Sequence, residues 1–505
     1  MKPNILLITA DQWRGDSLGL AGHPVVRTPA IDRLASEGVA FLRHYAGTAP
    51  CSPARAVLYT GLFQMNNRVC RNGTPLDDRF DNIARMARRA GYDPTLFGYT
   101  DVSPDPRVHD PDDPLLTTYE GILPGFTVRL KLPEHEGPYL SWLRGRGHDV
   151  ADTCAAHRAV DPAEVSSAPP VYSRGETPTA FVAGEFIRWL SEQEEDRPWF
   201  AHVSFIRPHP PFIAPEPYNT LYDPASGPAF AARPSVAEER GLHPFVDWQI
   251  DRCQKAHFIA GASGMAADWS EEQRRIIRAI YWGMISEVDD QFARMRQAME
   301  VAGAWDNTLV IFTSDHGELM GDHHLFGKGG FFDGSYHIPL VIRMPGHDGA
   351  RGAKVEEFTG AVDIMATLSD ILGVAPKTSA DGHSLKPFLD GTGPEKWRDA
   401  AFWEFDFRDI PHQKAEEHFS LSSRQCNGSV LRSDAFKYVH FAGLPPLLFD
   451  LRSDPAETTN VAADPAYRDV RLEMAEKLLA IRAEHLDQTL ALTELTESGP
   501  MSRRS

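Results

Sequence analysis

Residues 51–61 read CSPARAVLYTG, and the order of residue types in this stretch predicts a helix that begins at Cys51. Pro53 is suited to the first turn of a helix, which places residue 51 at the N-terminus. The free N–H groups and the dipole of a helix favour an anion at that end. Arg55, one turn on, can hold an oxyanion or the nucleophile itself. The alternative for Cys51 is a small buried hydrophobe, which is the commonest fate of a free cysteine.

Strands and helices alternate on both sides of this stretch. Short apolar runs are typical of buried parallel strands, and they occur at residues 4–9, 95–98, 199–205 and 308–313. Helices are expected over residues 28–38 and from Ser270, where Gln273 completes a capping box, to about residue 301. The alternation predicts an α/β fold whose large, mixed, mostly parallel sheet is sandwiched by helices.

Polar residues follow the first and the last of these apolar runs. Asp11-Gln12 comes after residues 4–9, and residues 314–318 (SDHGE) come after residues 308–313. Ligands of open α/β sheets bind outside the carboxyl ends of the strands, where carboxylate, amide and imidazole side chains can ligate a metal ion. Each motif taken alone is more often a helix cap or a turn, but together they indicate one site.

The remaining chain predicts a smaller second unit. Residues 101–174 are rich in Pro, Asp and Gly and are expected to loop over the sheet. Short strands and turns after about residue 376 indicate an antiparallel sheet, followed by a helix over residues 467–485. We therefore expect a catalytic domain at 1–375 and an α+β subdomain packed on it at 376–485. Residues 486–505 form a tail without a core, either frayed or an arm that reaches a neighbouring subunit of a homo-oligomer.

Charge and composition limit the partners. The formal charge of −19, from 51 basic and 70 acidic residues, argues against nucleic-acid binding. No run approaches the roughly 20 apolar residues of a membrane span, and the N-terminus lacks the features of a secretory signal. The five cysteines are scattered without CxxC spacing. The expected location is the cytoplasm.

The motifs resemble those of formylglycine-dependent sulfatases of the alkaline phosphatase superfamily. Residues 51–55 match the C-x-P-x-R signature, and residues 60–61 match its Thr-Gly extension. Four further segments match in the same order along the chain. They are residues 28–35 (TPAIDRLA), 205–212 (FIRPHPPF), 314–328 (SDHGELMGDHHLFGK) and 448–457 (LFDLRSDPAE).

Departures from the common sulfatase pattern look like the phosphonate monoester hydrolase branch. Common sulfatases have two adjacent Asp residues where this chain has Asp11-Gln12, and Asp-Asn where it has Asp315-His316. Residues 98–101 (GYTD) replace a segment that carries a Lys and a His. Asp101 stands where the branch usually has an uncharged residue, and a carboxylate there would repel an anionic substrate unless a base pairs with it.

The resemblance implies hydrolysis of small sulfate or phosphonate monoesters, with broad specificity. An oxidising maturation enzyme would convert Cys51 to formylglycine, and one hydroxyl of the hydrated aldehyde would attack sulfur or phosphorus. One divalent metal would be held by Asp11, Gln12, Cys51, Asp315 and His316. The imidazole makes manganese the expected ion, with zinc, iron and calcium as alternatives.

The resemblance also implies roles for five further residues. Arg55 and Lys328 would spread the negative charge of the transition state, and His209 and Lys328 are candidates for protonating the leaving oxygen. Asn72 and Tyr99 fall where the phosphonate hydrolase branch has polar substrate contacts. Simpler readings are a loop hydrogen bond for His209, a solvated charge for Lys328, a turn pair for Asn72-Gly73 and packing for Tyr99.

Two other functions compete with this one. A phosphatase or phosphodiesterase of the same superfamily would use Ser52 or Thr9 as nucleophile and would need a second set of metal ligands. A catalytically silent binding protein would keep the fold and leave Cys51 unoxidised.

Overall fold

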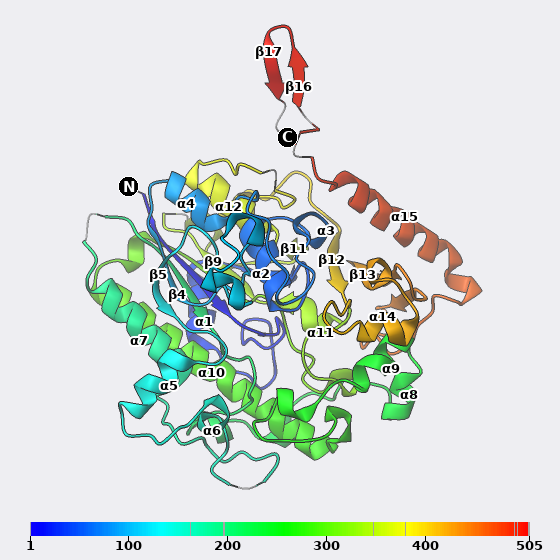
Figure 1. Ribbon diagram of the computed structural model, residues 1–505, viewed down its shortest axis with the longest axis horizontal. Helices are drawn as coiled ribbons and strands as arrows, with labels where there is room; N and C mark the ends of the chain where they lie inside the picture. Colours follow the sequence, from blue (N-terminus) through cyan, green and yellow to red (C-terminus); the bar gives the residue numbers. More distant parts are fainter. Residues whose placement is uncertain are drawn as a thin grey trace.

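The computed structural model describes residues 2–161, 163–194, 197–346, 348–378, 380–488, 490–491 and 493–502. The chain is built around an eight-stranded sheet (Figure 1). In spatial order its strands are β10 (Ala353–Val355), β2 (Val39–Phe41), β9 (Leu340–Arg343), β7 (Thr308–Thr313), β1 (Asn4–Ala10), β6 (Phe200–Phe205), β4 (Pro94–Gly98) and β5 (Thr127–Lys131).

The sheet is mixed and mostly parallel, as the sequence predicts. Only β9 runs against its neighbours, pairing antiparallel with both β2 and β7. All the other neighbouring strands pair in parallel. β1 lies between β7 and β6, and every one of its residues is buried, so that its carboxyl end opens at the middle of the sheet edge.

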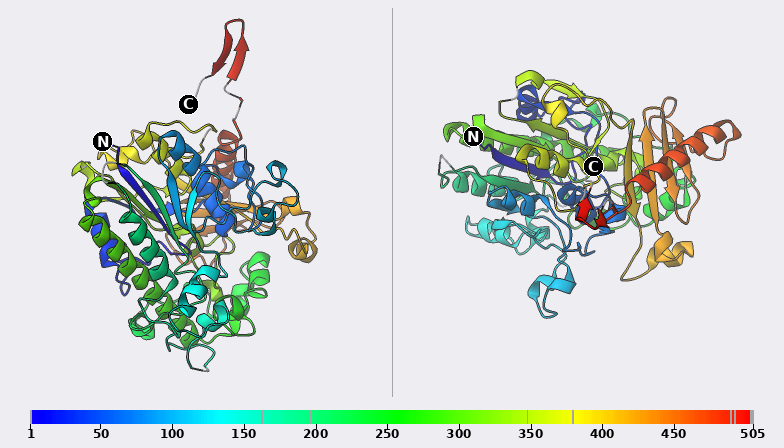
Figure 2. Two further views of the ribbon diagram at one scale, coloured as in Figure 1. Left: turned by 60° about the vertical axis from the view of Figure 1, so that its left-hand side comes forward. Right: turned by 90° about the horizontal axis from the view of Figure 1, so that it is seen from above.

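Helices cover both faces of the sheet (Figure 2). One group packs on one face and consists of α1 (Pro29–Glu37), α7 (Pro178–Leu190) and α10 (Glu271–Val301). The other face carries α2 (Cys51–Thr60), α4 (Ile83–Arg89) and α12 (Asp363–Leu372). α2 begins at Cys51, with Pro53 in its first turn, as predicted.

The capping predictions differ in outcome. α10 starts at the predicted capping box of Ser270 and Gln273. Thr28 precedes α1 but makes no side-chain cap. Instead, the buried carboxylate of Asp289 on α10 accepts from the N–H groups of Ala30 and Ile31 at 2.9 and 2.8 Å. Asp289, which comes 259 positions after Ala30, therefore accepts the free N–H groups at the start of α1. No local sequence pattern could reveal this partner.

A second, antiparallel sheet lies beyond the main one. Its strands follow the order β12 (Ala400–Asp406), β13 (Asn427–Ser433), β14 (Phe436–Phe441) and β15 (Leu447–Asp450). α15 (Arg468–Glu484) packs on β13 and β14 through Met474 and Leu478. The predicted antiparallel sheet with a helix is confirmed, whereas the domain limits at residues 375 and 485 stay predictions.

The prediction that residues 101–174 only loop over the sheet is wrong. They include β5, the edge strand beside β4, and two helices, α5 (Gly137–Arg144) and α6 (Thr153–Ala156). The pattern of β5 concealed it, because Thr127, Val128 and Arg129 are exposed at the sheet edge and give no apolar run.

The remaining elements are short. Three two-residue strands, β11 (Thr359–Gly360), β3 (His44–Tyr45) and β8 (His337–Ile338), form a small sheet. The other helices are α3 (Gln64–Asn67), α8 (Val236–Arg240), α9 (Pro244–Ile250), α11 (Asp333–Tyr336), α13 (Lys386–Leu389) and α14 (Lys414–Phe419). The tail contains a hairpin of β16 (Thr493–Thr496) and β17 (Gly499–Ser502). Over the residues that the structure describes, no helix is both long and apolar enough to cross a lipid bilayer.

Candidate active site

The carboxyl ends of β1 and β7 bring the two predicted ligand pairs together. The strands pair in parallel with Thr9 opposite Thr313, so the residues that follow them leave the sheet side by side. The backbone N–H of Gln12 donates to Asp315 Oδ1 at 3.2 Å. Residues 300 positions apart thus share one site, as the two strand-end motifs predict.

The N-terminus of α2 places Cys51 in the same site. Cys51 Sγ lies 3.2 Å from His316 Nε2 and 3.1 Å from Lys328 Nζ. One potential ligand atom each from Asp11, Cys51, Asp315 and His316 lies within 4.8 Å of the others, and all four residues are buried. The structure therefore joins the chemically distinctive motifs of the sequence in one buried cluster.

The donor set of this cluster fits a divalent cation. Asp11 Oδ1 is buried and, within the described part of the chain, has no hydrogen-bond partner, although burying a carboxylate oxygen unpaired is costly. His316 Nδ1 donates to the Gly317 carbonyl at 3.1 Å, which leaves the Nε2 lone pair facing the cluster. Burial lowers the pKa of His316 to about 4, so its imidazole is neutral, as a metal ligand must be.

Arg55 holds the two ligand carboxylates in place. Its fully buried guanidinium donates from Nε to Asp315 Oδ2 at 2.9 Å and from Nη2 to Asp11 Oδ2 at 3.2 Å. A third nitrogen, Nη1, donates to Ser204 Oγ on β6 at 2.9 Å. Whereas the sequence suggests that Arg55 faces an oxyanion, its hydrogen bonds fix the ligands and offset their charge.

Gln12 is oriented by a residue to which the sequence analysis assigns no role. Its Nε2 donates to Glu318, and its Oε1 accepts from Lys328 Nζ at 2.7 Å. Glu318 is buried and also accepts from the N–H of Met320 at 3.0 Å. The signal for Glu318 was its place in the SDHGE segment, five residues after β7 ends at Thr313.

Lys328 and His209 lie beside Asp11 and differ in charge. Burial alone would lower the pKa of Lys328, but the charges of Cys51, Asp11 and Asp315 outweigh it and raise that pKa. His209 follows β6, and its Nδ1 donates to the Pro210 carbonyl at 2.8 Å. Burial and the charge of Lys328 lower the pKa of His209. Lys328 therefore keeps its proton at neutral pH, whereas His209 is mainly neutral.

Comparison with known proteins identifies the family. A family model described as "Sulfatase" matches residues 3–374, and one described as "N-sulphoglucosamine sulphohydrolase, C-terminal" matches residues 321–484. The first match spans most of the chain. The chain belongs to the sulfatase family. It is an ester hydrolase with the alkaline phosphatase-like fold, which confirms the resemblance seen in the sequence.

Similar proteins cover the whole chain. The "Multifunctional alkaline phosphatase superfamily protein PehA" of Trinickia caryophylli is 38% identical over 99% of both chains. The phosphonate monoester hydrolase of Agrobacterium radiobacter superposes with a TM-score of 0.98, at 62% identity over 100% of both chains. The phosphonate monoester hydrolase SpPMH of Silicibacter pomeroyi has a TM-score of 0.94 and 37% identity, covering 100% of this chain and 99% of its own.

Sulfatases generally use a formylglycine and a divalent metal, and the state of Cys51 bears on the first of these. Burial raises the pKa of the Cys51 thiol well above its ordinary value, and the charge of Asp11 raises it further. Because the thiolate rather than the thiol is the nucleophile, unmodified Cys51 is a poor one in this site.

Asn72 and Tyr99, the predicted substrate-binding residues, make hydrogen bonds to other residues of this site. Asn72 Oδ1 accepts from the backbone N–H of Ser52 at 3.0 Å. The Tyr99 hydroxyl donates to Asp11 Oδ2, and its ring lies 4.1 Å from the Arg55 guanidinium carbon. Both residues thus support the nucleophile and ligand positions, and their substrate contacts stay a prediction.

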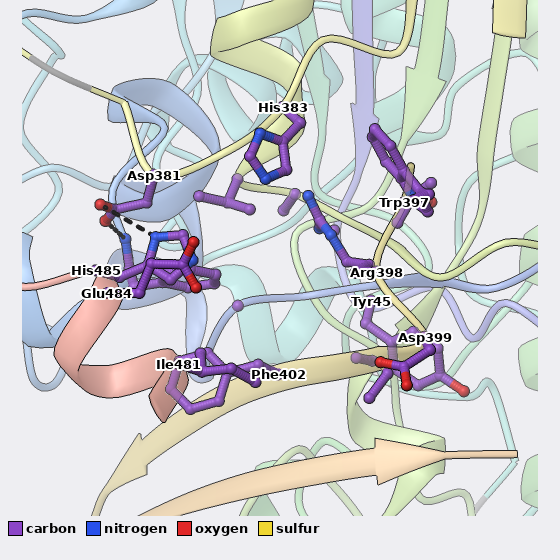
Figure 3. A pocket seen from close by; sticks show the side chains of 18 of the residues that line it. Tyr45, Asp381, His383, Trp397, Arg398, Asp399, Phe402, Ile481, Glu484 and His485 are labelled. Atoms are coloured by element: carbon purple, nitrogen blue, oxygen red, sulfur yellow. Dashed lines mark hydrogen bonds and ion pairs between the residues drawn. The ribbon is translucent and has the colours of Figure 1, made fainter. Parts of the chain in front are cut away.

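A pocket also lies away from the residues of this site. Figure 3 shows a pocket of about 440 Å³ between β12 and the end of α15, lined by aromatic and charged side chains that include Tyr45, Trp397, Phe402 and His485. None of the predicted catalytic, substrate or metal residues lines it.

Proposed function

We propose that this protein hydrolyses monoesters of sulfuric and phosphonic acids with a formylglycine made from Cys51. The observation that carries the proposal is the buried group of Asp11, Cys51, Asp315 and His316, with Lys328 Nζ 3.1 Å from Cys51 Sγ. The names of the similar proteins support the substrate class, because the two solved relatives named above, at 62% and 37% identity, are phosphonate monoester hydrolases.

Two groups that the chain would carry in its active form supply the chemistry. Formylglycine at position 51 provides a hydrated aldehyde, whose hydroxyl is a nucleophile for sulfur or phosphorus. Asp11, Gln12, Asp315 and His316 would hold a divalent metal, which would increase the ionised fraction of a hydroxyl and offset negative charge. The imidazole favours manganese, zinc or iron over calcium.

The residues around this centre bind and orient the ester. Arg55 and Tyr99 hold Asp11, and Arg55 also holds Asp315, so that the ligand set is rigid before substrate binds. Lys328 binds an oxyanion of the ester and, since it keeps its proton, is the preferred donor to the leaving oxygen. His209 is the second candidate for that proton transfer, a step worth about 10²–10⁴-fold in typical enzymes.

The direct test is to assay p-nitrophenyl sulfate and a p-nitrophenyl phosphonate with protein produced beside a formylglycine-generating enzyme. Turnover of at least one ester, lost on omission of the maturation enzyme, is the expected result. Equal activity with and without oxidation of residue 51 would contradict the proposal. A metal titration separates the rival two-metal phosphodiesterase, because the proposal requires one equivalent per chain and the rival requires two.

We also propose that residues 486–505 are an arm that packs on another copy of the chain. The hairpin of β16 and β17 projects away from the body (Figure 1), and a two-stranded hairpin alone is marginally stable in water. Leu490, Leu495 and Met501 on this segment are exposed. The arm starts at a fixed point, because Asn66 Nδ2 donates to the His485 carbonyl at 2.6 Å.

Truncation after His485 tests the arm. The full chain should sediment as a homo-oligomer and the truncated chain as a smaller species with an intact fold. The same number of chains per particle for the full and the truncated protein would contradict the proposal that the tail is an oligomerisation arm.

We retain the cytoplasm as the location of the protein. All five cysteines are free, which is usual in a reducing compartment. Cell fractionation tests this, and recovery outside the cytoplasm would contradict it.

A further inference from the structure

Asp101 is a buried acid of the active site to which the mechanism above gives no role. It follows β4 at the edge of the sheet where Asp11 and His209 also lie, and only 2% of its surface is exposed. Its φ of 53° is in the left-handed region, which few non-glycine residues adopt. A buried acid in this backbone conformation is costly, so its presence calls for a physical reason.

No well-formed hydrogen bond reaches the Asp101 carboxylate. Among the residues that the structure describes, neither Oδ1 nor Oδ2 has a partner at hydrogen-bond geometry, nor does the buried Ser52 hydroxyl, although Ser52 lies close enough to lower the pKa of Asp101. Ser52 directly follows the nucleophile position, and its N–H is held by Asn72. The Asp101 carboxyl therefore lies beside residue 51, where the substrate must bind, with Ser52 as its nearest polar neighbour among these groups.

Charged groups of both signs act on Asp101. Burial raises its pKa to about 7, the charges of Glu134 and Asp11 add to that rise, and Arg55 and the Ser52 hydroxyl oppose it. Cys51, Tyr59 and Tyr119 also interact electrostatically with Asp101. The carboxyl is therefore neutral at acidic pH, where it can donate a hydrogen bond, and becomes charged as the pH rises above 7.

A charged carboxyl at this place discriminates between substrates by their charge. Sulfate and phosphonate monoesters carry one negative charge, whereas phosphate monoesters carry nearly two above their second pKa of about 6. The second charge adds another repulsive interaction with Asp101, which at an effective dielectric of about 20 and a separation of about 6–8 Å corresponds to roughly 30–100-fold.

We propose that Asp101 is a specificity-determining residue that selects singly charged esters, the sulfate and phosphonate monoesters, over doubly charged phosphate monoesters. The inference rests on the proposed function, because it assumes that these esters bind beside residue 51. It gives a reason for an acid where the family resemblance leads us to expect an uncharged residue. Lys328, which keeps its proton, and Arg55, which opposes the rise in the Asp101 pKa, supply positive charge at the same site.

The test compares kcat/KM of oxidised wild-type and Asp101→Asn enzymes on p-nitrophenyl phenylphosphonate, sulfate and phosphate at pH 8. Asn tolerates the left-handed backbone and removes the charge. The ratio of phosphate to phosphonate activity should rise at least about tenfold in the variant. On the phosphonate, whose charge is constant, the wild type should lose activity as the pH rises through about 7, and the variant should lack this decline.

Two further variants keep the test decisive. Asp112→Asn removes an exposed charge from the same segment and should leave the ratio unchanged, because solvent screens that position. Asp101→Gly replaces Asp101→Asn if the latter does not fold, since glycine adopts positive φ freely.

The outcomes distinguish this inference from the function on which it rests. A phosphate-to-phosphonate ratio within about twofold of the wild type, in an active variant, overturns the selectivity role and leaves the hydrolase standing. A wild type that cleaves none of the three esters contradicts the proposed function. In that case calorimetry measures the dissociation constants of the phosphate and phosphonate esters for the wild type and for Asp101→Asn. The change in the ratio of these constants then decides the role of Asp101.

Discussion

Two buried charge clusters in this molecule differ in one respect, namely whether every acidic oxygen has a partner. In the first, between α11 and the antiparallel sheet of β12 to β15, Lys437 Nζ donates to Asp333 at 2.8 Å and to Glu457. Arg432 donates to the other oxygen of Asp333 at 3.2 Å, and the Asp333 N–H donates to Glu457 at 3.3 Å. We call Lys437, Asp333, Glu457 and Arg432 the clamp.

The active-site cluster is more deeply buried than the clamp, and its pairing is incomplete. In the described ranges, Asp11 Oδ1 has no hydrogen-bond partner, and no well-formed hydrogen bond reaches either oxygen of Asp101. The comparison teaches that complete pairing marks a structural role, whereas unpaired buried oxygens mark the place for a metal ion or a substrate. Removal of a residue should therefore affect stability in the clamp and activity in the site.

The largest expected effect is on turnover. Cys51→Ala should lower kcat/KM by about 10⁴-fold or more, because it removes the nucleophile. The midpoint of thermal unfolding should stay near the wild-type value. A kinetic assay of ester cleavage measures kcat/KM, and calorimetry measures the midpoint of thermal unfolding. Loss of the fold together with activity would show that Cys51 acts through packing.

Lys437→Met tests the clamp and should have the converse result. The substitution takes a cation from Asp333 and Glu457 and leaves them with the contacts of Arg432 and the Asp333 N–H. This loss should cost about 3 kcal/mol of unfolding free energy, the low end of the range for one partner of a buried ion pair. Urea titration measures this loss. The remaining folded protein should keep kcat/KM near the wild-type value, and an unchanged stability would contradict the structural role.

Metal removal should affect both quantities at the active site. A ligand present at 100 times its Kd stabilises the folded state by about 2.7 kcal/mol, so treatment with a chelator should lower the unfolding midpoint and abolish turnover. Asp315→Asn provides the control, because a protein with an impaired site should respond less to the chelator. Full activity after verified metal removal would contradict the metal role.

The smallest effect is expected at Glu318, which acts through Gln12. Glu318→Gln replaces an acceptor of three hydrogen bonds, from Gln12, Met320 and Gly327, with an amide that cannot accept them all. Residues of this kind typically change metal affinity by about 10–100-fold. Competition with a chelating dye measures the affinity, with the exposed Glu272→Gln as control. Equal affinities for the two variants would remove Glu318 from the site.

The contrast between the clusters also explains what the sequence could predict. Parallel strands with polar carboxyl ends, and the helix start at Cys51, have local patterns, so the sheet and the meeting of Asp11, Cys51, Asp315 and His316 were predictable. The family resemblance supplied His209 and Lys328, whose surroundings give no strong local signal.

What could not be predicted depends on partners distant in the chain. Asp289 as the acceptor for α1, Glu318 as the support of Gln12, and the Arg55 bonds to two carboxylates all require the three-dimensional arrangement. β5 was missed because an exposed edge strand has no apolar run. Glu457 ends the quoted LFDLRSDPAE motif, yet it belongs to the clamp, so a family motif can report structure rather than chemistry.

The central claim is that position 51 of the active protein carries an oxidised side chain. Peptide mass spectrometry of active enzyme tests it most directly, on the fragment that contains residues 51–55. We expect the mass change that accompanies conversion of a CH2SH group to CHO, in a fraction that rises in proportion to specific activity. Fully active enzyme with only unmodified Cys51 would contradict the account.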